Sequence, residues 1–188
     1  MCQLNTMYYN DTVPACTEKS LTSLTTSLNS EARNLIDNAL WYLGGGDNSD
    51  LYADDYYTME RGTAVSSSSY PYRWTGKIGL MYPSDYAYAA DLNLCKLTGY
   101  NYESEGSNCA TTDWLFNRKY QWLMSPNSGY SYGAWLVFEA GFVAYGDDGG
   151  HTVDFEYGVR PLAILKSDVT KLEGEGTSGN PYKLGLGT

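Results

Sequence analysis

The sequence has few charged residues, a single histidine and no long apolar run, and each shortage excludes a class of protein. Charged residues make up 18% of the 188 residues, which is low for a cytosolic protein. His151 is the only histidine, and neither an H-E-x-x-H motif nor a C-x2-C pair occurs, so zinc sites lack their usual ligands. No apolar run approaches the length of a membrane span.

Signatures of catalysis are also missing. There is no G-x-S-x-G nucleophile elbow and no G-x-x-x-x-G-K-[ST] phosphate loop. His151 follows two glycines in a polar segment, a poor setting for the general base of a triad with Asp154 and a serine. The 22 acidic residues offer many glycosidase-type pairs, but none lies in an apolar run that would raise its pKa, and Glu139 is the closest case. We therefore expect a protein that is not an enzyme and uses no cofactor, with a carbohydrate-active enzyme as a lesser alternative.

The chain is rich in acidic residues and in tyrosine. Its 12 Lys and Arg against 22 Asp and Glu give a net charge of −10, which disfavours nucleic acid and anionic lipid as partners. Tyrosine occurs 19 times against 4 phenylalanines. Because tyrosine combines a large apolar ring with a polar tip and few rotamers, this excess favours a surface that binds another molecule.

Four cysteines lie in polar, loop-like sequence, and the pairs Cys2/Cys16 and Cys95/Cys109 have the same spacing. An even number of cysteines in such a setting favours two local disulfides and an oxidising compartment. Other connectivities and four reduced thiols in a cytosolic protein remain as alternatives. The first residues lack the basic region and apolar core of a signal peptide, so we expect any export signal or anchor to lie outside this chain.

The hydrophobic pattern predicts one α+β domain at residues 30–188, preceded by a polar arm at residues 1–29. One amphipathic helix is expected from Ala32 to Leu43, capped by Asn29 or Ser30 and ended by the glycines at 44–46. Antiparallel strands are expected at 74–82, 121–124, 134–139, 142–145 and 159–165, with Ala140-Gly141 as a turn. Residues 113–116 are expected to open a short helix, 86–94 to form a helical turn, and 174–182 to be peripheral. The acidic segment 47–55 does not match a calcium-loop motif.

The last third of the chain carries a recognisable pattern: Trp122-x-x-Ser125-Pro126, then Gly141-Phe142-Val143, then Gly158-Val159-Arg160-Pro161. The pattern resembles C-type-lectin-like domains of the formylglycine-generating-enzyme type. The segments 41–44, 74–86 and 176–182 are similar to surface proteins of gut Firmicutes with this domain, so the resemblance covers the chain from about residue 30. Members include variable proteins of diversity-generating retroelements and pilin-like proteins.

The resemblance implies an extracellular or cell-surface domain that binds an unknown protein or glycan on another cell or a phage. In the retroelement systems, mutagenesis diversifies solvent-facing positions with residues such as Asn, Tyr, Ser, Asp and His, and residues 127–157 carry this composition. The predicted binding face consists of Tyr130, Tyr132, Trp135, Tyr145, Asp147, Asp148, His151, Asp154 and Tyr157. For each residue, burial in the core or simple solvation is an equally weighted alternative.

Other residues are assigned to the scaffold. Trp122, Val159 and Leu162 are expected in the core, and Arg160 is expected to have a carboxylate partner because an unpaired buried charge is costly. The calcium triplets of sugar-binding C-type lectins and the catalytic cysteines of the formylglycine enzymes are absent, which argues against calcium-dependent sugar binding and against oxidase activity. The alternative to a binding domain is a pilin-like or other surface subunit that assembles with copies of itself.

Because the chain lacks lectin calcium triplets and zinc-spaced ligands, we predict that the domain needs no metal. Incubation with EDTA should leave the melting temperature unchanged in a thermal denaturation experiment. A fall in melting temperature that calcium alone reverses would contradict this prediction.

Overall fold

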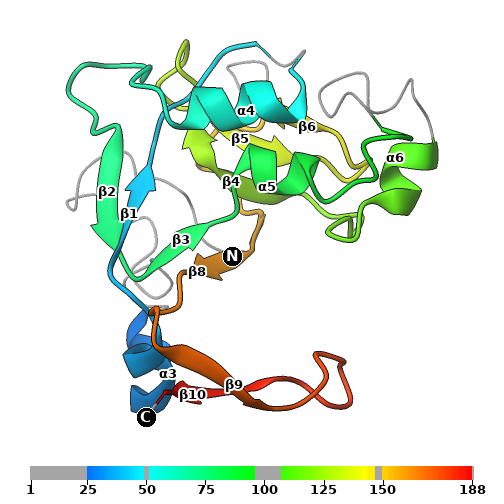
Figure 1. The fold of residues 1–188 in the computed structure, drawn as a ribbon. Helices are drawn as coiled ribbons and strands as arrows, with labels where there is room; N and C mark the ends of the chain where they lie inside the picture. The colour runs from blue at the N-terminus through cyan, green and yellow to red at the C-terminus, as the bar shows by residue number, and fades with distance from the viewer. Residues whose placement is uncertain (1–24, 49–50, 96–106, 147–149, 188) are drawn as a thin grey trace.

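The computed structural model describes residues 25–48, 51–95, 107–146 and 150–187, and a four-stranded sheet lies at its centre (Figure 1). The strand order is β6-β5-β4-β7, with β4 at Gln121–Pro126, β5 at Ala134–Val137, β6 at Val143–Tyr145 and β7 at Gly158–Val159. β5 is antiparallel to both neighbours, whereas β7 runs parallel to β4. The described part of the chain is mixed α+β and mostly strand, as the sequence predicted.

Both faces of the central sheet are buried, which explains why β4 and β5 read as continuous apolar runs. Successive side chains of a strand point to opposite faces. Leu123 and Trp135 therefore pack into one core cluster with helices α4 (Ala53–Glu60) and α5 (Pro83–Ala87). Trp122 and Leu136 pack into a second cluster on the other face, together with Trp41 from β1. Of the residues assigned to the scaffold, Trp122 is fully buried, and Val159 and Leu162 are half-buried and pack against this second cluster.

Three two-stranded sheets and two short helices complete the described structure. β1 (Ala39–Tyr42) pairs with β2 (Arg73–Gly76), and β3 (Ile78–Leu80) pairs with β8 (Pro161–Ala163). β9 (Val169–Glu173) and β10 (Lys183–Leu186) form a hairpin that lies apart from the central sheet, beside helix α3 (Ser30–Leu35), as Figure 1 shows. Helix α6 spans Ser107–Thr112.

The predicted helix over 32–43 is wrong beyond Leu35. Helix α3 begins as expected, because the side chain of Asn29 accepts a hydrogen bond from the backbone N–H of Ala32 at 2.7 Å. The chain then leaves the helix, and residues 39–42 form β1, in which Trp41 is buried and Leu40 is exposed. The apolar spacing fitted a helix by coincidence, and the pairing of Trp41 with Trp74 across β1 and β2 overrides it.

The three glycines at 44–46 were predicted to end a helix, and this prediction is wrong. They allow the backbone to pass between α4 and β4. A Cβ atom on Gly44 would lie 2.5 Å from the carbonyl oxygen of Met59, and one on Gly45 would collide with the carbonyl of Pro126. The N–H of Gly44 donates to the carbonyl of Glu60 at 3.0 Å. Residues with side chains are therefore excluded by close backbone approach rather than by helix termination.

Other predicted boundaries shift by a few residues. The strand expected at 74–82 is divided into β2 and β3, and the expected helical turn at 86–94 gives way to α5, which ends at Ala87. The turn between β5 and β6 spans residues 138–141, where Gly141 has a φ of 100° and donates to the carbonyl of Phe138. The helix expected at 113–116 is wrong: these residues are not helical, and the short helix α6 ends before them at Thr112. The segment 174–182 connects the unpredicted strands β9 and β10.

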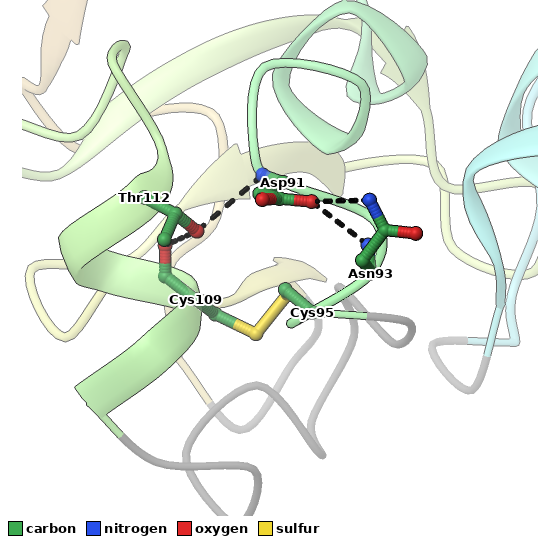
Figure 2. Close-up of a disulfide and its surroundings, with 5 residues drawn as sticks. All are labelled: Asp91, Asn93, Cys95, Cys109 and Thr112. Carbon is green, nitrogen blue, oxygen red and sulfur yellow. Dashed lines mark hydrogen bonds between the residues drawn. A yellow bond between two sulfur atoms is a disulfide. The ribbon is translucent and has the colours of Figure 1, made fainter.

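The predicted disulfide Cys95–Cys109 is present, and both cysteines are buried (Figure 2). It joins the turn after α5 to helix α6. Nearby, the hydroxyl of Thr112 accepts from the backbone N–H of Asp91 at 3.4 Å, and the carboxylate of Asp91 accepts from Asn93. Cys2 and Cys16 lie outside the described residues, as does most of the predicted arm, so their pairing stays a prediction.

None of the helices in residues 25–48, 51–95, 107–146 and 150–187 is long and apolar enough to span a bilayer.

The burial of β4 predicts a sharp contrast between core and loop substitutions. Trp122→Ala should lower the free energy of unfolding by about 3–5 kcal/mol, because a fully buried indole leaves a cavity. Tyr132→Ala should change it by about 0.5 kcal/mol or less, because that side chain is 59% exposed. Chemical denaturation followed by tyrosine and tryptophan fluorescence measures both, and equal losses would contradict the placement of Tyr132 on the surface.

Candidate functional site

The register of the central sheet brings four strand ends to one place. Gln121 of β4 pairs with Gly158 of the parallel β7, so the residues before both strands, Tyr120 and Tyr157, lie side by side. Gln121 also pairs with Val137 at the end of the antiparallel β5, which places Phe138 next to Tyr120. The N–H of Phe138 donates to the carbonyl of Phe142, the residue before β6, at 2.9 Å. A cluster of aromatic rings at this edge is therefore a direct consequence of strand register.

The rings of this aromatic cluster are in stacking and edge contact. Tyr120 and Tyr157 stack with centroids 4.9 Å apart and an interplanar angle of 21°. Phe138 and Phe142 stack at 4.3 Å, and Phe138 meets Tyr120 edge-on at 5.4 Å. Phe155 extends the stack beyond Tyr157 at 5.8 Å. Such pairs contribute roughly 0.5–1.5 kcal/mol each beyond the area that they bury.

His151 is part of the aromatic cluster rather than a solvated loop residue. Its ring stacks on Tyr120 at 5.1 Å, and its Nδ1 atom shares a hydrogen bond of 2.6 Å with the hydroxyl of Tyr157. Phe138 approaches the same imidazole edge-on at 4.8 Å. The three contacts fix the orientation of the imidazole and of the Tyr157 hydroxyl.

A groove of about 580 Å³ opens beside the two stacked tyrosines. Hydrogen-bonding and charged side chains share its lining with the tyrosine rings, and the charges balance between two cations and two carboxylates. These polar lining residues are Asn117, Arg118, Lys119, Gln121, Glu139 and Glu156. The Nε2 atom of Gln121 donates to the Oδ1 atom of Asn117 at 2.9 Å, which holds both amides in place. The groove thus combines aromatic surface with groups that donate and accept hydrogen bonds.

Unusual backbone geometry is concentrated at the same site. Among the described residues, only Arg118 and His151 are non-glycine residues with positive φ, at 58° and 59°. The left-handed region is disfavoured for residues with a side chain, and residues held there tend to occur at functional sites. Arg118 lines the groove, and His151 contacts the tyrosines of the groove.

Both groove tyrosines are held in their neutral form. Burial raises the pKa of the Tyr120 hydroxyl, and the nearby Glu139 carboxylate adds to the effect. Burial also raises the pKa of Tyr157, with a further contribution from Tyr120. Each phenol therefore remains able to donate and to accept a hydrogen bond throughout the physiological pH range.

The residues predicted for the binding face do not form one surface. His151 and Tyr157 belong to the aromatic cluster, whereas Tyr130 and Tyr132 lie in the loop after β4 and form an edge-on pair with centroids 6.0 Å apart. Asp154, in the loop before β7, is exposed and accepts a hydrogen bond from the hydroxyl of Thr152. Asp147 and Asp148 lie outside the described residues.

Two of the predicted binding residues belong to the scaffold. The prediction for Trp135 is wrong, because its side chain is 0% exposed and its indole N–H donates to the carbonyl of Gly46 at 3.2 Å. Tyr145 is half-buried and packs edge-on against Trp135 at 5.5 Å. Both residues lie on the sheet face that α4 and α5 cover, which the sequence pattern could not reveal.

The sequence interpretation missed Tyr120, Phe138, Phe142 and Phe155. A usable signal was present for the first three, because each directly precedes or follows a strand of the central sheet. Without the pairing order β6-β5-β4-β7, nothing in the sequence indicates that these strand ends meet.

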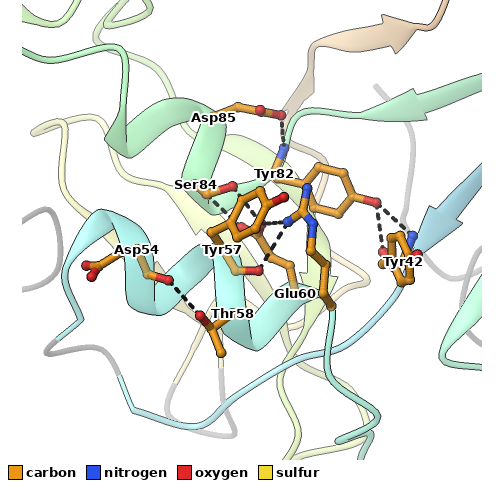
Figure 3. A network of polar contacts seen from close by, with 9 residues as sticks. Tyr42, Asp54, Tyr57, Thr58, Glu60, Tyr82, Ser84 and Asp85 are labelled. Carbon is orange, nitrogen blue, oxygen red and sulfur yellow. Dashed lines mark hydrogen bonds and ion pairs between the residues drawn. The ribbon is translucent and has the colours of Figure 1, made fainter.

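A second polar cluster, centred on the buried Glu60 and Ser84, lies between α4 and α5 (Figure 3). The carboxylate of Glu60, 0% exposed, accepts hydrogen bonds from the backbone N–H and the hydroxyl of Ser84, both at 2.6 Å. Arg61 contributes an ion pair with Glu60 at 3.2 Å, and its guanidinium lies over the ring of Tyr57. Burial raises the pKa of Glu60 to about 7. Glu60 does not line the groove. Its hydrogen bonds with Ser84 connect α4 to α5.

Arg160 was expected to have a carboxylate partner, and the structure shows a backbone carbonyl as its hydrogen-bond acceptor and an electrostatic effect on one carboxyl group. Its guanidinium donates to the backbone carbonyl of Leu115 at 2.9 Å. The charge of Arg160 also acts on the buried carboxyl of Asp113, although burial dominates there and raises the pKa of Asp113 to about 6. Arg160 thus joins the start of β8 to the segment after α6.

Nothing in the described residues groups three or more His, Cys, Asp or Glu side chains in a position to hold a metal ion. Comparisons of the chain with protein-family models, with curated proteins and with solved structures return no match.

The buried carboxyl of Glu60 predicts that stability falls as pH rises. The folded state raises this pKa from 4.5 to about 7, so it retains the proton that the unfolded chain loses. The contribution is fully present below pH 4.5 and is lost as pH rises to 7, and it amounts to about 3 kcal/mol. Glu60→Gln keeps an acceptor for the N–H of Ser84 and should remove most of this slope, as measured by denaturation across pH 4–8.

The exposed Glu175 provides a matched control, since Glu175→Gln should leave the slope unchanged. Asp113 adds a smaller fall of the same sign, because its pKa is raised from 3.8 to about 6. A slope that survives intact in the Glu60→Gln variant would place the titrating group elsewhere.

Proposed function

We propose that this chain is an extracellular ligand-binding domain whose ligand occupies the groove beside Tyr120 and Tyr157. The observation that carries the proposal is the coincidence, at one sheet edge, of a stacked aromatic surface, a polar groove and two strained residues. Tyrosine and arginine dominate the energetics of binding surfaces, and both line this groove. The buried disulfide Cys95–Cys109 is compatible with an oxidising, extracellular location.

The chemistry of the groove favours a glycan over a protein ligand. The apolar C–H groups of a pyranose ring pack well against aromatic side chains, and the sugar hydroxyls need donors and acceptors around them. Tyr120 and Tyr157, which are themselves stacked, supply the aromatic surface of the groove, while the amides of Asn117 and Gln121 and the carboxylate of Glu139 supply hydrogen bonds. With its cations and carboxylates in balance, the groove attracts neither strongly acidic nor strongly basic ligands.

The finer identity, a C-type-lectin-like domain of the retroelement-variable type, is part of this proposal. It is supported by the resemblance of the motifs around Trp122, Gly141 and Arg160, and by the Tyr, Ser and Asn residues of segment 127–133. In this view Tyr130 and Tyr132 belong to a variable loop surface separate from the groove, and the aromatic cluster is a constant part of the domain. A reverse transcriptase and a near-identical template repeat beside the gene are the expected genomic signature.

We expect the protein to bind members of an array of immobilised glycans, and Tyr120→Ala and Tyr157→Ala to weaken that binding at least tenfold. The physical reason is the loss of the ring on which the sugar stacks, which corresponds to about 1.4 kcal/mol or more. Tyr88→Ala is the control, because Tyr88 is a tyrosine that does not line the groove, although it is more exposed than the half-buried Tyr120 and Tyr157. Titration of the best glycan by isothermal calorimetry gives the affinities.

Several outcomes would overturn the proposed site. If Tyr88→Ala weakens binding as much as Tyr120→Ala, the groove has no special role. If Tyr130→Ala and Tyr132→Ala abolish binding while the groove variants retain it, the ligand lies on the loop after β4 instead. If no glycan is retained at all, the glycan assignment fails.

A further inference from the structure

The β9–β10 hairpin carries two unpaired strand edges away from the central sheet. β9 and β10 pair with each other, and no other strand of the described residues pairs with either of them. Figure 1 shows the hairpin at the far end of the molecule from α4, and among the described helices and strands α3 lies beside it. A two-stranded hairpin without a covering surface is marginally stable in water, so this element gains from additional contacts.

Exposed apolar side chains are concentrated on this part of the chain. Leu172 is 62% exposed, the most of any leucine or isoleucine among the described residues. The other exposed apolar residues of this region are Ile164, Leu165, Tyr182, Leu184 and Leu186. Leu184 and Leu186 pair with Lys171 and Val169, so they lie on the face of the hairpin opposite to Leu172. Exposed apolar surface of this kind marks a site of contact with another molecule.

The charges on β9 are arranged for pairing with an identical strand. Lys171 and Glu173 lie on the same face of β9, and Leu172 lies between them on the other face. If two copies of β9 pair antiparallel about a twofold axis at Leu172, Lys171 of each copy faces Glu173 of the other. The same axis places the two Leu172 side chains directly opposite each other.

Lysine on an edge strand often prevents unwanted pairing. Here a shift of the register by one residue on each strand would place Lys171 opposite Lys171, and the repulsion would disfavour that arrangement. The charge pattern therefore permits the register centred on Leu172 and disfavours the register in which Lys171 faces Lys171.

We propose that the β9 edge is a self-association site, at which two copies of this chain pair antiparallel about Leu172 to form a four-stranded sheet in the order β10-β9-β9-β10. The contact is isologous, because the same edge serves both partners. It leaves the groove beside Tyr120 untouched, so it stands independently of the proposed function. The pairing of one short strand buries little area, which predicts a weak dimer with a dissociation constant of about 1–100 μM.

Sedimentation velocity over a wide range of protein concentration tests this proposal. The measured mass should rise with concentration from the monomer value of 20.8 kDa towards twice that value. Lys171→Glu should abolish the rise, because two Glu–Glu pairs replace two Lys–Glu pairs, and Leu172→Asp should do the same. Lys119→Glu and Leu40→Asp are the controls, as they make the same changes at exposed positions away from β9.

A triple charge reversal makes the test specific. Within the hairpin, Lys183 pairs with Glu173 at 2.6 Å, so Lys171→Glu, Glu173→Lys and Lys183→Glu together restore both the internal pair and the pairs between copies. This variant should dimerise again. A wild-type protein that remains monomeric at every concentration overturns the proposal, as does a dimer that Lys171→Glu and Leu172→Asp leave intact. Thermal melting of each variant verifies that the fold is retained.

Discussion

The burial of β4 on both faces is the constraint on which the rest of the structure depends. Every residue from Gln121 to Pro126 is buried, and so is every residue of β5 beside it. An apolar strand of this kind must be covered on two sides, which requires α4 and α5 on one face and β1 and β3 with their side chains on the other. The glycines at 44–46 let the chain pass close to the end of β4, and the sealed Glu60–Ser84 contact holds the covering helices in place.

The sequence predicted the central strands well, because their apolar runs are long and have clear boundaries. β4, β5 and β6 were found at nearly their observed positions, and the Cys95–Cys109 disulfide was predicted from the even number of cysteines, their polar surroundings and their matched spacing. Residues 39–42 were misassigned because apolar residues at helical spacing also suit a strand whose partner is distant in sequence. The strand β1 exists because β2 is there to pair with it, and no local pattern encodes that contact.

Only part of the candidate site could be predicted from the sequence, for the same reason. His151 and Tyr157 stood out because they lie in a polar, tyrosine-rich segment, but their partners Tyr120 and Phe138 border apolar strands and look like core residues. Trp135 was placed correctly in a strand, at 134–139, but its side chain was assigned to the binding face, whereas it is buried in the core. Composition identifies the kind of surface that a chain can build, whereas strand order decides which residues compose it.

The parallel pairing of β4 with β7 has a consequence for how this protein can change over evolutionary time. Tyr120 and Tyr157 are 37 positions apart in sequence, yet the contact Gln121–Gly158 keeps them adjacent whatever lies between them. Substitutions in the loop at 127–133, which does not line the groove, would therefore leave the stacked pair in place. A lineage could diversify that loop while the stacking surface is inherited intact.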